Sequence, residues 1–411
     1  MKTYIIIDLK TFYASVECVE RNLDPFKTDL VVADIKRNKG AICLAISPKM
    51  KMRGIKNRCR IYDIPKNVKP IIAKPRMKKY IEYSAKIYGI YLNYVSKEDI
   101  HVYSIDEAFL DVTTYLKMYK MDGISLAKKI MDDIKKQTGI TATAGVGTNM
   151  YLAKIALDIL SKHDESNIGY LDEKLYKEKM LDHTPLTDFW QIGKGIQNRL
   201  YKHHIMTMRD ILNANPSILY KEFGVNALYL IDHANGIEPM TIKEIKEYKP
   251  VSTSISSSQI LFRNYNEKEA RVIIIEMLDL LVLELVKKNL YTDNISLHIS
   301  LSDYGHIQFS VNVNSSNSFK KIKDLVLEEY DYCVKSNVIR RIGISFNGLT
   351  DKKYEQLDLF SSYEENDKDL ESTINNIKNK FGKNSLLRCI SLDENATMRI
   401  RNNYIGGHNA K

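Results

Sequence analysis

Cysteines are few in this sequence, and they are scattered. Five occur in 411 residues, at Cys18, Cys43, Cys59, Cys333 and Cys389. An odd number without close pairs argues against a disulfide-stapled secreted domain and against a zinc site built on paired cysteines. The pattern instead indicates reduced thiols in a cytosolic protein.

Long apolar runs and a secretion signal are also missing. No stretch reaches the roughly 18 apolar residues that a membrane-spanning helix needs. Met1-Lys2-Thr3 leads directly into a short strand-like run rather than into a signal peptide. We therefore expect a cytoplasmic protein with no membrane partner. The length is enough for two to four domains, and the sequence contains no internal repeat and no low-complexity tract.

Acidic residues are nearly absent from one segment. Residues 36–79 contain fifteen lysines and arginines, and only Asp63 opposes them. The formal net charge of +10 arises entirely within residues 1–235, because residues 236–411 hold 24 basic and 24 acidic side chains. Such a concentration of one sign predicts a polyanionic partner. The alternative is a lysine-rich surface from an AT-biased genome, which the abundance of Lys, Asn and Ile keeps open.

Carboxylates do occur at the ends of two strand-like runs that are far apart in the chain. Asp8 ends the apolar run 4–7, and Asp106 and Glu107 follow the run 102–105. If these strands lie side by side, three carboxylates converge and repel one another unless cations neutralise them. Oxygen-only ligands favour Mg²⁺, and a pair of such ions can catalyse in-line attack at phosphorus. The alternative is that Asp8 and Asp106 only cap the helices that follow.

Hydrophobic periodicity predicts a mixed α/β (α+β) fold. The first part of the chain has a βαβ–βαβ order, which indicates a sheet of ferredoxin-like topology. We expect short helices over residues 166–235, a linker over 236–258 and a small α/β module over 259–350. In that module the pattern predicts helices at 269–288 and 319–330 and strands at 295–301, 306–313 and 339–346.

Two segments closely resemble the signature motifs of Y-family translesion DNA polymerases. They are Asp8–Glu17 and Tyr103–Asp111, and the similarity continues through Ala153–Ala156. The order of modules is most similar to the bacterial UmuC-like (ImpB/MucB/SamB) branch. The resemblance implies a right-hand polymerase with a palm (1–35 and 76–165), fingers (36–75), a helical thumb with a helix-hairpin-helix (166–235), a linker (236–258), a little finger (259–350) and a C-terminal tail (351–411).

The resemblance also implies roles for residues of the two motifs. Asp8, Asp106 and Glu107 would be the catalytic residues and would hold two Mg²⁺ ions together with the carbonyl of Leu9. Tyr13 corresponds to the family's steric gate, whose ring lies under the sugar of the incoming nucleotide. We include the adjacent Phe12 in the nucleotide-binding set, although it is the better candidate for a core residue. The alternative for Tyr13 is likewise a core aromatic.

Basic residues of the fingers would bind the triphosphate. Lys49, Lys51 and Arg53 follow a strand and open a helix, where phosphate binds readily. The chain departs here from many family members, because Pro48 and Lys51 stand where those members have a tyrosine and an arginine. Lysine lacks bidentate geometry, so which basic residue contacts the triphosphate stays open. Lys154 and Lys162 are further candidates, and Lys162 lies one residue beyond the spacing of some branches.

Two further motifs point to macromolecular partners. Residues 190–196 resemble a helix-hairpin-helix turn, in which Gly193, Lys194 and Gly195 would approach DNA phosphates without reading sequence. The second motif resembles a sliding-clamp-binding peptide and consists of Gln356, Leu357, Asp358, Leu359 and Phe360. Its apolar side chains lie in a polar segment and are costly there unless a groove receives them. The alternative is that this segment folds back onto the protein.

Taken together, these patterns predict a low-fidelity, template-directed DNA polymerase for translesion synthesis and DNA repair. Its partners would be primer-template DNA, dNTPs, a sliding clamp and accessory proteins of the SOS response, and we expect a monomer. One alternative is another two-metal phosphoryl-transfer enzyme, such as a nuclease or a nucleotidyl cyclase. A second is a catalytically vestigial DNA- and clamp-binding accessory protein.

Overall fold

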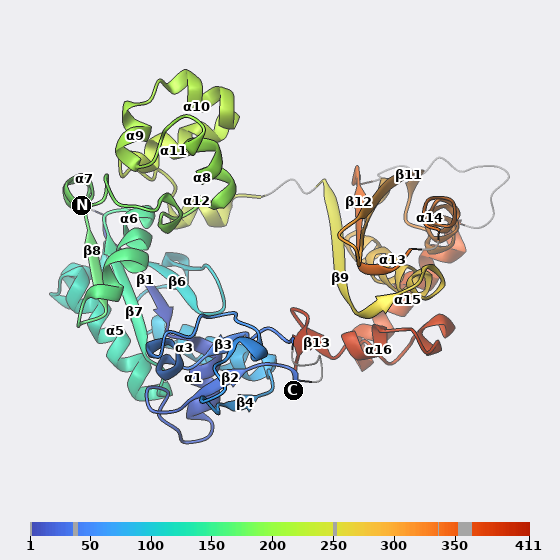
Figure 1. Ribbon diagram of the computed structural model, residues 1–411, viewed down its shortest axis with the longest axis horizontal. Coiled ribbons are helices and arrows are strands. Elements are labelled where there is room, and N and C mark those ends of the chain that lie inside the picture. Colours follow the sequence, from blue (N-terminus) through green and yellow to red (C-terminus); the bar gives the residue numbers. More distant parts are fainter. Residues whose placement is uncertain (1, 36–39, 250–252, 336, 352–363) are drawn as a thin grey trace. The chain divides into compact units, whose positions relative to one another are not determined.

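The computed structural model describes residues 2–35, 40–249, 253–335, 337–351 and 364–411 (Figure 1). The chain forms two compact units. Unit 1 comprises Met1–Lys249 together with His408–Lys411, and unit 2 comprises Pro250–Gly407. In the described ranges, no helix combines the length and the apolar character needed to cross a bilayer.

The centre of unit 1 is a five-stranded sheet with β1 in the middle. Its strands, in spatial order, are β5 (Ile100–Val102), β6 (Glu107–Asp111), β1 (Tyr4–Leu9), β7 (Ala142–Gly147) and β8 (Ile168–Leu171). β1 is antiparallel to both neighbours, and β7 and β8 are parallel. Residues 4–7 are buried without alternation because helices cover both faces of the sheet. The ferredoxin-like α/β fold predicted from the sequence is confirmed.

One helix lies unusually close to this sheet. α6 (Met150–Ile155) packs Met150 and Ala153 against Tyr4, Ile6 and Phe109. The approach is close because β7 carries glycines where the helix backbone touches it. A Cβ added at Gly145 would lie 2.0 Å from the carbonyl oxygen of Ala153, and one at Gly147 would lie 2.3 Å from the amide nitrogen of Ala153.

The other elements of residues 12–138 complete the two layers and a small second sheet. The helices are α1 (Phe12–Val19), α2 (Pro48–Met52), α3 (Met77–Tyr91), α4 (Tyr115–Tyr119) and α5 (Gly123–Thr138). The second sheet has the order β3 (Ala45–Ile46), β2 (Leu30–Val32) and β4 (Ile71–Ala73). It encloses its own core of Val31, Cys43, Ile46 and Met50, so the basic segment is a small folded module.

Six short helices follow the sheet, and the first five share a separate core. They are α7 (Glu173–Lys179), α8 (Lys194–Tyr201), α9 (Met208–Asn213), α10 (Pro216–Phe223), α11 (Ala227–Ala234) and α12 (Ile242–Glu247). α12 lies inside the predicted linker 236–258, and its Ile242 packs on Tyr4 and Ile6. Thr241 and Glu244 form a capping box that begins this helix. The stretch between the units is therefore much shorter than the predicted linker, because β9 already begins at Ser254.

Unit 2 is a four-stranded antiparallel sheet with helices packed on one face. The strands, in spatial order, are β11 (His306–Ser316), β10 (Thr292–Leu301), β12 (Ile339–Asn347) and β9 (Ser254–Tyr265), and the main helices are α13 (Glu267–Lys288) and α14 (Phe319–Cys333). Alternate strand residues such as Ile295, Leu297 and Ile344 face the helices and are fully buried. The helices and three strands predicted for residues 259–350 are present, but the sequence analysis missed β9, which begins inside the predicted linker.

The C-terminal segment folds onto the outer side of α13. Its elements are α15 (Glu364–Phe381), α16 (Met398–Arg401) and β13 (Tyr404–Ile405), whereas β14 (His408–Asn409) belongs to unit 1. Arg388 bonds the buried Asp279 of α13, and Glu276 of α13 accepts the backbone N–H groups of Thr397 and Met398. These contacts explain why a 22-residue helix so rich in leucine and isoleucine carries two buried carboxylates.

Candidate active site

The sheet of unit 1 brings the predicted carboxylates together. Asp8 and Glu107 stand directly opposite each other in the register of β1 and β6. The turn before β6 places Asp106 next to them, since the backbone N–H of Leu9 donates to the carbonyl oxygen of Asp106 at 3.0 Å. The sequence-based expectation that these three residues meet at one sheet end agrees with the structure.

The carboxylate of Asp8 is largely buried and lies close to two other carboxylates, those of Glu107 and Asp106. Burial, together with the charges of Glu107 and Asp106, raises the pKa of Asp8 to about 7. Lys154 acts in the opposite direction but does not cancel the effect. Like charges directly opposite in a strand pair destabilise it, so this site is suited to a bound cation.

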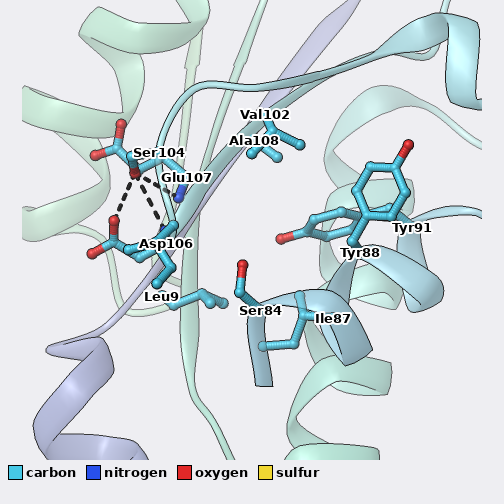
Figure 2. Close-up of a pocket in the computed structure, with 11 residues that line it drawn as sticks. Leu9, Ser84, Ile87, Tyr88, Tyr91, Val102, Ser104, Asp106, Glu107 and Ala108 are labelled. Carbon is cyan, nitrogen blue, oxygen red and sulfur yellow. Dashed lines mark hydrogen bonds between the residues drawn. The ribbon is translucent and has the colours of Figure 1, made fainter. Parts of the chain in front are cut away.

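A serine holds the turn that carries Asp106. The hydroxyl of Ser104 donates to Oδ1 of Asp106 at 2.6 Å and accepts the backbone N–H of Glu107 at 3.1 Å (Figure 2). It also accepts the N–H of Asp106 at 3.3 Å. The sequence analysis did not single out Ser104. A serine two residues before an aspartate is a common local turn signal, and it could have indicated this role.

Lys154 binds a predicted catalytic carboxylate, that of Glu107, rather than lying free to bind phosphate. Its Nζ lies 3.0 and 3.1 Å from the two carboxylate oxygens of Glu107 and 3.2 Å from Oδ1 of Asp158. Only 7% of the Lys154 side chain is exposed. Burial alone would lower its pKa, but Asp158 and Glu107 outweigh burial and raise it. In this arrangement the predicted triphosphate contact by Lys154 is replaced by an ion pair.

The oxygen atoms at this sheet end are of the kind that bind a hard divalent cation, but the side chains are not already arranged around a common metal position. Asp8, Asp106 and Glu107 offer carboxylate oxygens, which Mg²⁺ prefers. In the described part of the chain, no cluster of three or more His, Cys, Asp or Glu side chains is already arranged as a metal site. The carboxylate of Glu107 is instead paired with Lys154.

A hollow lies beside the carboxylates, between the turn before β6 and α3. Ser84, Tyr88 and Tyr91 of α3 line it on one side, and Asp106 and Glu107 line it on the other (Figure 2). The carboxylate groups of Asp106 and Glu107 point away from the α3 side chains that line this hollow (Figure 2).

Tyr13 lies near the same carboxylates at the start of α1. Burial raises the pKa of its hydroxyl, and the charge of Asp106 contributes to the rise. Its ring stacks on the ring of Tyr80, with centroids 4.4 Å apart and an interplanar angle of 16°. Phe12 is only 2% exposed. Its side chain belongs to the core, as the sequence analysis preferred, and a contact of Phe12 with the nucleotide stays a prediction.

The basic residues of the fingers point in different directions. Lys49 and Arg53 both pair with Asp29, at 3.3 Å each, and the ammonium of Lys49 also donates to the carbonyl of Lys27. Lys51 is exposed, and its charge lowers the pKa of Lys10, after the larger effect of burial. Of the three predicted phosphate-binding residues, Lys51 is therefore the one on the side of the carboxylates.

Lys10 is a site residue that the sequence analysis missed. It directly follows β1, its ammonium bonds Oδ1 of Asn167, and the charge of Asp8 acts on its pKa in the raising direction. It lies within the first motif, two residues after Asp8, so its position in the sequence was the available signal.

Lys162 is exposed just beyond a distorted part of the α6 helix. The helix continues from Ile155 into a π-helical turn over Ala156–Leu160 and then a 3-10 turn beginning at Ser161. A π turn accommodates one residue more than an α turn. The single extra residue before Lys162 is therefore absorbed within the helix.

The predicted DNA contact of the thumb is at a helix start. Gly193 is the N-cap of α8, and Lys194 and Gly195 are its first residues. A Cβ added at Gly193 or Gly195 would meet no described atom within 4 Å, so the backbone N–H groups there are open to close approach. The predicted clamp-binding residues 356–360 lie outside the described residues.

Comparison with known proteins places the chain in a family. Residues 7–158 match the impB/mucB/samB family, and residues 252–359 match the C-terminal domain of the same family. The chain belongs to the impB/mucB/samB family. It is a Y-family, DNA-directed DNA polymerase, as the resemblance of its two motifs implied.

Similar proteins cover nearly the whole of this Y-family polymerase. The putative UV-damage repair protein UvrX of Bacillus subtilis is 28% identical, with 99% of this chain and 97% of the relative aligned. DNA polymerase IV 2 of Bacillus subtilis is 27% identical (99% and 98%), and DNA polymerase IV of Clostridium acetobutylicum is 26% identical (96% and 99%).

Solved structures share the fold of this Y-family polymerase. A Y-family DNA polymerase chimera of Dbh and Dpo4 matches with a TM-score of 0.65 and 24% identity, covering 85% of this chain and all of that one. An insertion ternary complex of Dbh DNA polymerase matches with a TM-score of 0.51 and 25% identity over the same shares. The predicted right-hand polymerase fold class is thereby confirmed.

Proposed function

We propose that this Y-family polymerase performs low-fidelity translesion synthesis, adding dNTPs to a primer 3′-hydroxyl with two Mg²⁺ ions. The observation that carries the proposal is the convergence of Asp8, Asp106 and Glu107 at one sheet end, where burial and mutual repulsion raise the pKa of Asp8. Names of relatives that refer to UV-damage repair and DNA polymerase IV support it. The palm, fingers, thumb and little-finger boundaries given above are part of the proposal.

Metal binding would use the oxygens already at this sheet end. The ligands would be Asp8, Asp106, Glu107 and the carbonyl of Leu9. When bound, the two ions would activate the primer hydroxyl and stabilise the leaving pyrophosphate. Ser104 would keep Asp106 aimed at the site, and Lys154 would hold Glu107 in place until the cation charge competes for it.

The incoming nucleotide would lie between α1 and the fingers. Lys10, which senses the charge of Asp8, and Lys51, which lies near Lys10, would contact the triphosphate, and Lys162 would reach it from beyond the π turn. Tyr13 would lie beneath the sugar and exclude a ribose 2′-hydroxyl by overpacking. Lys49 and Arg53 would instead support the fingers through Asp29.

DNA would contact both units without sequence readout. In unit 1, the backbone at Gly193, Lys194 and Gly195 would bind a phosphate at the start of α8. In unit 2, the sheet face opposite the helices carries neutral polar side chains. Ser256, Ser345, Ser296 and Ser310 form one row across all four strands, and Ser254, Asn347, Asn294 and Asn312 form another. Hydroxyl and amide groups donate to phosphate oxygens at any sequence.

A sliding clamp would bind residues 356–360, and SOS accessory proteins remain candidate partners. The support for clamp binding is the apolar character of Leu357, Leu359 and Phe360 in an otherwise polar segment. A binding measurement between the clamp and a peptide of residues 352–364 would test this part alone.

Primer extension tests the main proposal. The purified protein, with clamp and accessory proteins supplied, should extend a primer on undamaged and abasic templates only when Mg²⁺ is present. Degradation of the DNA instead of extension would favour a nuclease, and binding without either reaction would favour the vestigial accessory protein.

Tyr13→Ala should increase ribonucleotide incorporation. Removing the ring opens the space that a 2′-hydroxyl would fill, so the preference for dNTP over rNTP should fall by about 10- to 100-fold. The measurement is kcat/KM for dCTP and for CTP opposite a template guanine. An unchanged ratio would remove Tyr13 from the role of steric gate.

Lys51→Ala and Lys49→Ala should have different effects although the two lysines are neighbours. Lys51→Ala should raise the KM for dNTP by about 10-fold, because a charged phosphate contact is lost. Lys49→Ala should leave KM nearly unchanged and lower the free energy of unfolding by about 1 kcal/mol, because it weakens the half-exposed pair with Asp29. Steady-state kinetics and thermal melts on both variants would check this, and reversed effects would contradict it.

A further inference from the structure

A buried carboxylate lies one helical turn beyond Tyr13. Glu17 is on the same face of α1, four residues after Tyr13, and it is fully buried. Its oxygens have two arginine partners and one tyrosine partner. Nε and Nη2 of Arg76 each donate to one carboxylate oxygen at 2.9 Å, and Arg21 bonds Oε2.

The tyrosine partner links this carboxylate to Tyr13. The hydroxyl of Tyr80 donates to Oε1 of Glu17 at 2.8 Å, and its ring lies nearly parallel to the ring of Tyr13 at 4.4 Å. Tyr80 is fully buried in α3, so its ring cannot swing away from this position without disturbing the core. The ring of Tyr13 therefore packs on the ring of Tyr80, its platform, and the hydroxyl of Tyr80 is held by the carboxylate of Glu17.

The platform is fixed from a second direction by the start of α3. Arg76 directly precedes α3, and the backbone N–H of Tyr80 donates to the carbonyl of Arg76 at 3.2 Å. The same arginine thus binds Glu17 through its guanidinium and Tyr80 through its backbone. A buried ion pair is a poor way to gain stability, because desolvation offsets the attraction. A bidentate pair does fix geometry closely, which is what a steric filter needs.

We propose that Glu17, Arg76 and Tyr80 form a positioning unit that holds the ring of Tyr13 in place and thereby sets the discrimination between deoxyribose and ribose. This inference rests on the proposed function, in which Tyr13 faces the nucleotide sugar. A ring that can shift gives room to a 2′-hydroxyl, whereas a ring stacked on a fixed neighbour does not. Glu17 and Tyr80 are fully buried and act on the sugar only through Tyr13, and Arg76 acts through Glu17, so all three are positioning residues.

The test compares sugar discrimination in four variants of the full chain. Tyr80→Leu removes the platform, Glu17→Gln removes the charge that holds it, and Tyr80→Phe keeps the ring but loses the hydrogen bond. Glu276→Gln is the matched control, because Glu276 is an equally buried carboxylate in unit 2. Single-nucleotide kcat/KM values for a dNTP and the corresponding rNTP give the ratio, and thermal melts report folding.

In Tyr80→Leu and Glu17→Gln, the ratio of kcat/KM for dNTP to kcat/KM for rNTP should fall about 3- to 10-fold. The fall should come from a higher kcat/KM for rNTP, while kcat/KM for dNTP should stay within about 2-fold of wild type. Tyr80→Phe should lie between these variants and wild type, and Glu276→Gln should keep the wild-type ratio. Losses of dNTP and rNTP use in equal proportion would mean a structural role only and would overturn the inference. If Tyr80→Leu does not fold, Tyr80→Phe and Glu17→Gln decide the question alone.

Tyr13→Ala separates failure of this inference from failure of the proposed function. If Tyr13→Ala relaxes sugar selection while folded Tyr80→Leu and Glu17→Gln do not, the positioning unit is rejected and the gate remains. If Tyr13→Ala itself leaves the ratio unchanged, the role of Tyr13 is rejected and the inference with it.

Discussion

Asp106→Asn should reduce Mg²⁺-dependent primer extension by about 1,000-fold, since a metal-bound carboxylate contributes several kcal/mol to transition-state stabilisation. The fold should survive the change. The amide oxygen of asparagine can still accept the hydroxyl of Ser104, which holds the turn before β6. The variant therefore removes charge at the site while keeping its shape. Extension rates under saturating DNA and dNTP, together with a DNA-binding measurement, would check the result.

Asp111→Asn is the matched control for this variant. Asp111 lies on the same strand, β6, at the end away from the site, and its Oδ1 accepts the backbone N–H of Thr113 at 3.0 Å. The same chemical change there should alter extension by about 2-fold at most, as is usual away from a functional site. Wild-type extension by Asp106→Asn, or equal losses in both variants, would contradict the proposed metal site.

Lys154→Met should destabilise unit 1 strongly. It would leave Glu107 and Asp158 without their shared cation, close to the already strained Asp8. Breaking a buried ion pair by removing one partner is costly, but Asp158 is about a third exposed and solvent screens part of the charge. We expect the free energy of unfolding to fall by about 2–3 kcal/mol. Thermal or urea unfolding in chelator would measure it.

Lys128→Met provides the comparison. Lys128 is an exposed lysine of α5, and replacing it should change the free energy of unfolding by no more than about 0.5 kcal/mol. Equal stability losses at the two lysines would show that Lys154 has no special role. Added Mg²⁺ should restore part of the loss in Lys154→Met, because it would neutralise the same carboxylates.

The central sheet of unit 1 and the convergence of its carboxylates could be predicted because each depends on short, local patterns. The apolar run of β1 ends at Asp8, and a second apolar run ends just before Asp106 and Glu107. Pairing of β1 with β6 is therefore enough to bring the three carboxylates together. The linker at 236–258 was predicted too long for an equally local reason. Thr241 and Glu244 form the capping box that begins α12. The sequence analysis gave more weight to the Lys- and Glu-rich composition and therefore assigned a linker there.

The directions of the basic side chains could not be predicted in the same way. Composition shows that residues 36–79 are basic, but it does not show that Asp29, outside that segment, binds both Lys49 and Arg53. The contact of Tyr13 with Tyr80 joins α1 to α3 across 67 positions, and no periodicity reports it. Such contacts depend on how helices pack, which sequence patterns constrain only weakly.

The two glycines of β7, Gly145 and Gly147, affect the predicted active site indirectly, because they set how closely α6 approaches the sheet. Any larger residue at Gly145 would put its Cβ 2.0 Å from the backbone of α6, where ordinary contacts are about 3.5–4 Å. The helix would have to retreat by more than an ångström, and it would carry the ammonium of Lys154 away from Glu107. Substitutions at these buried, uncharged positions should therefore impair nucleotide addition even though no substrate ever reaches them.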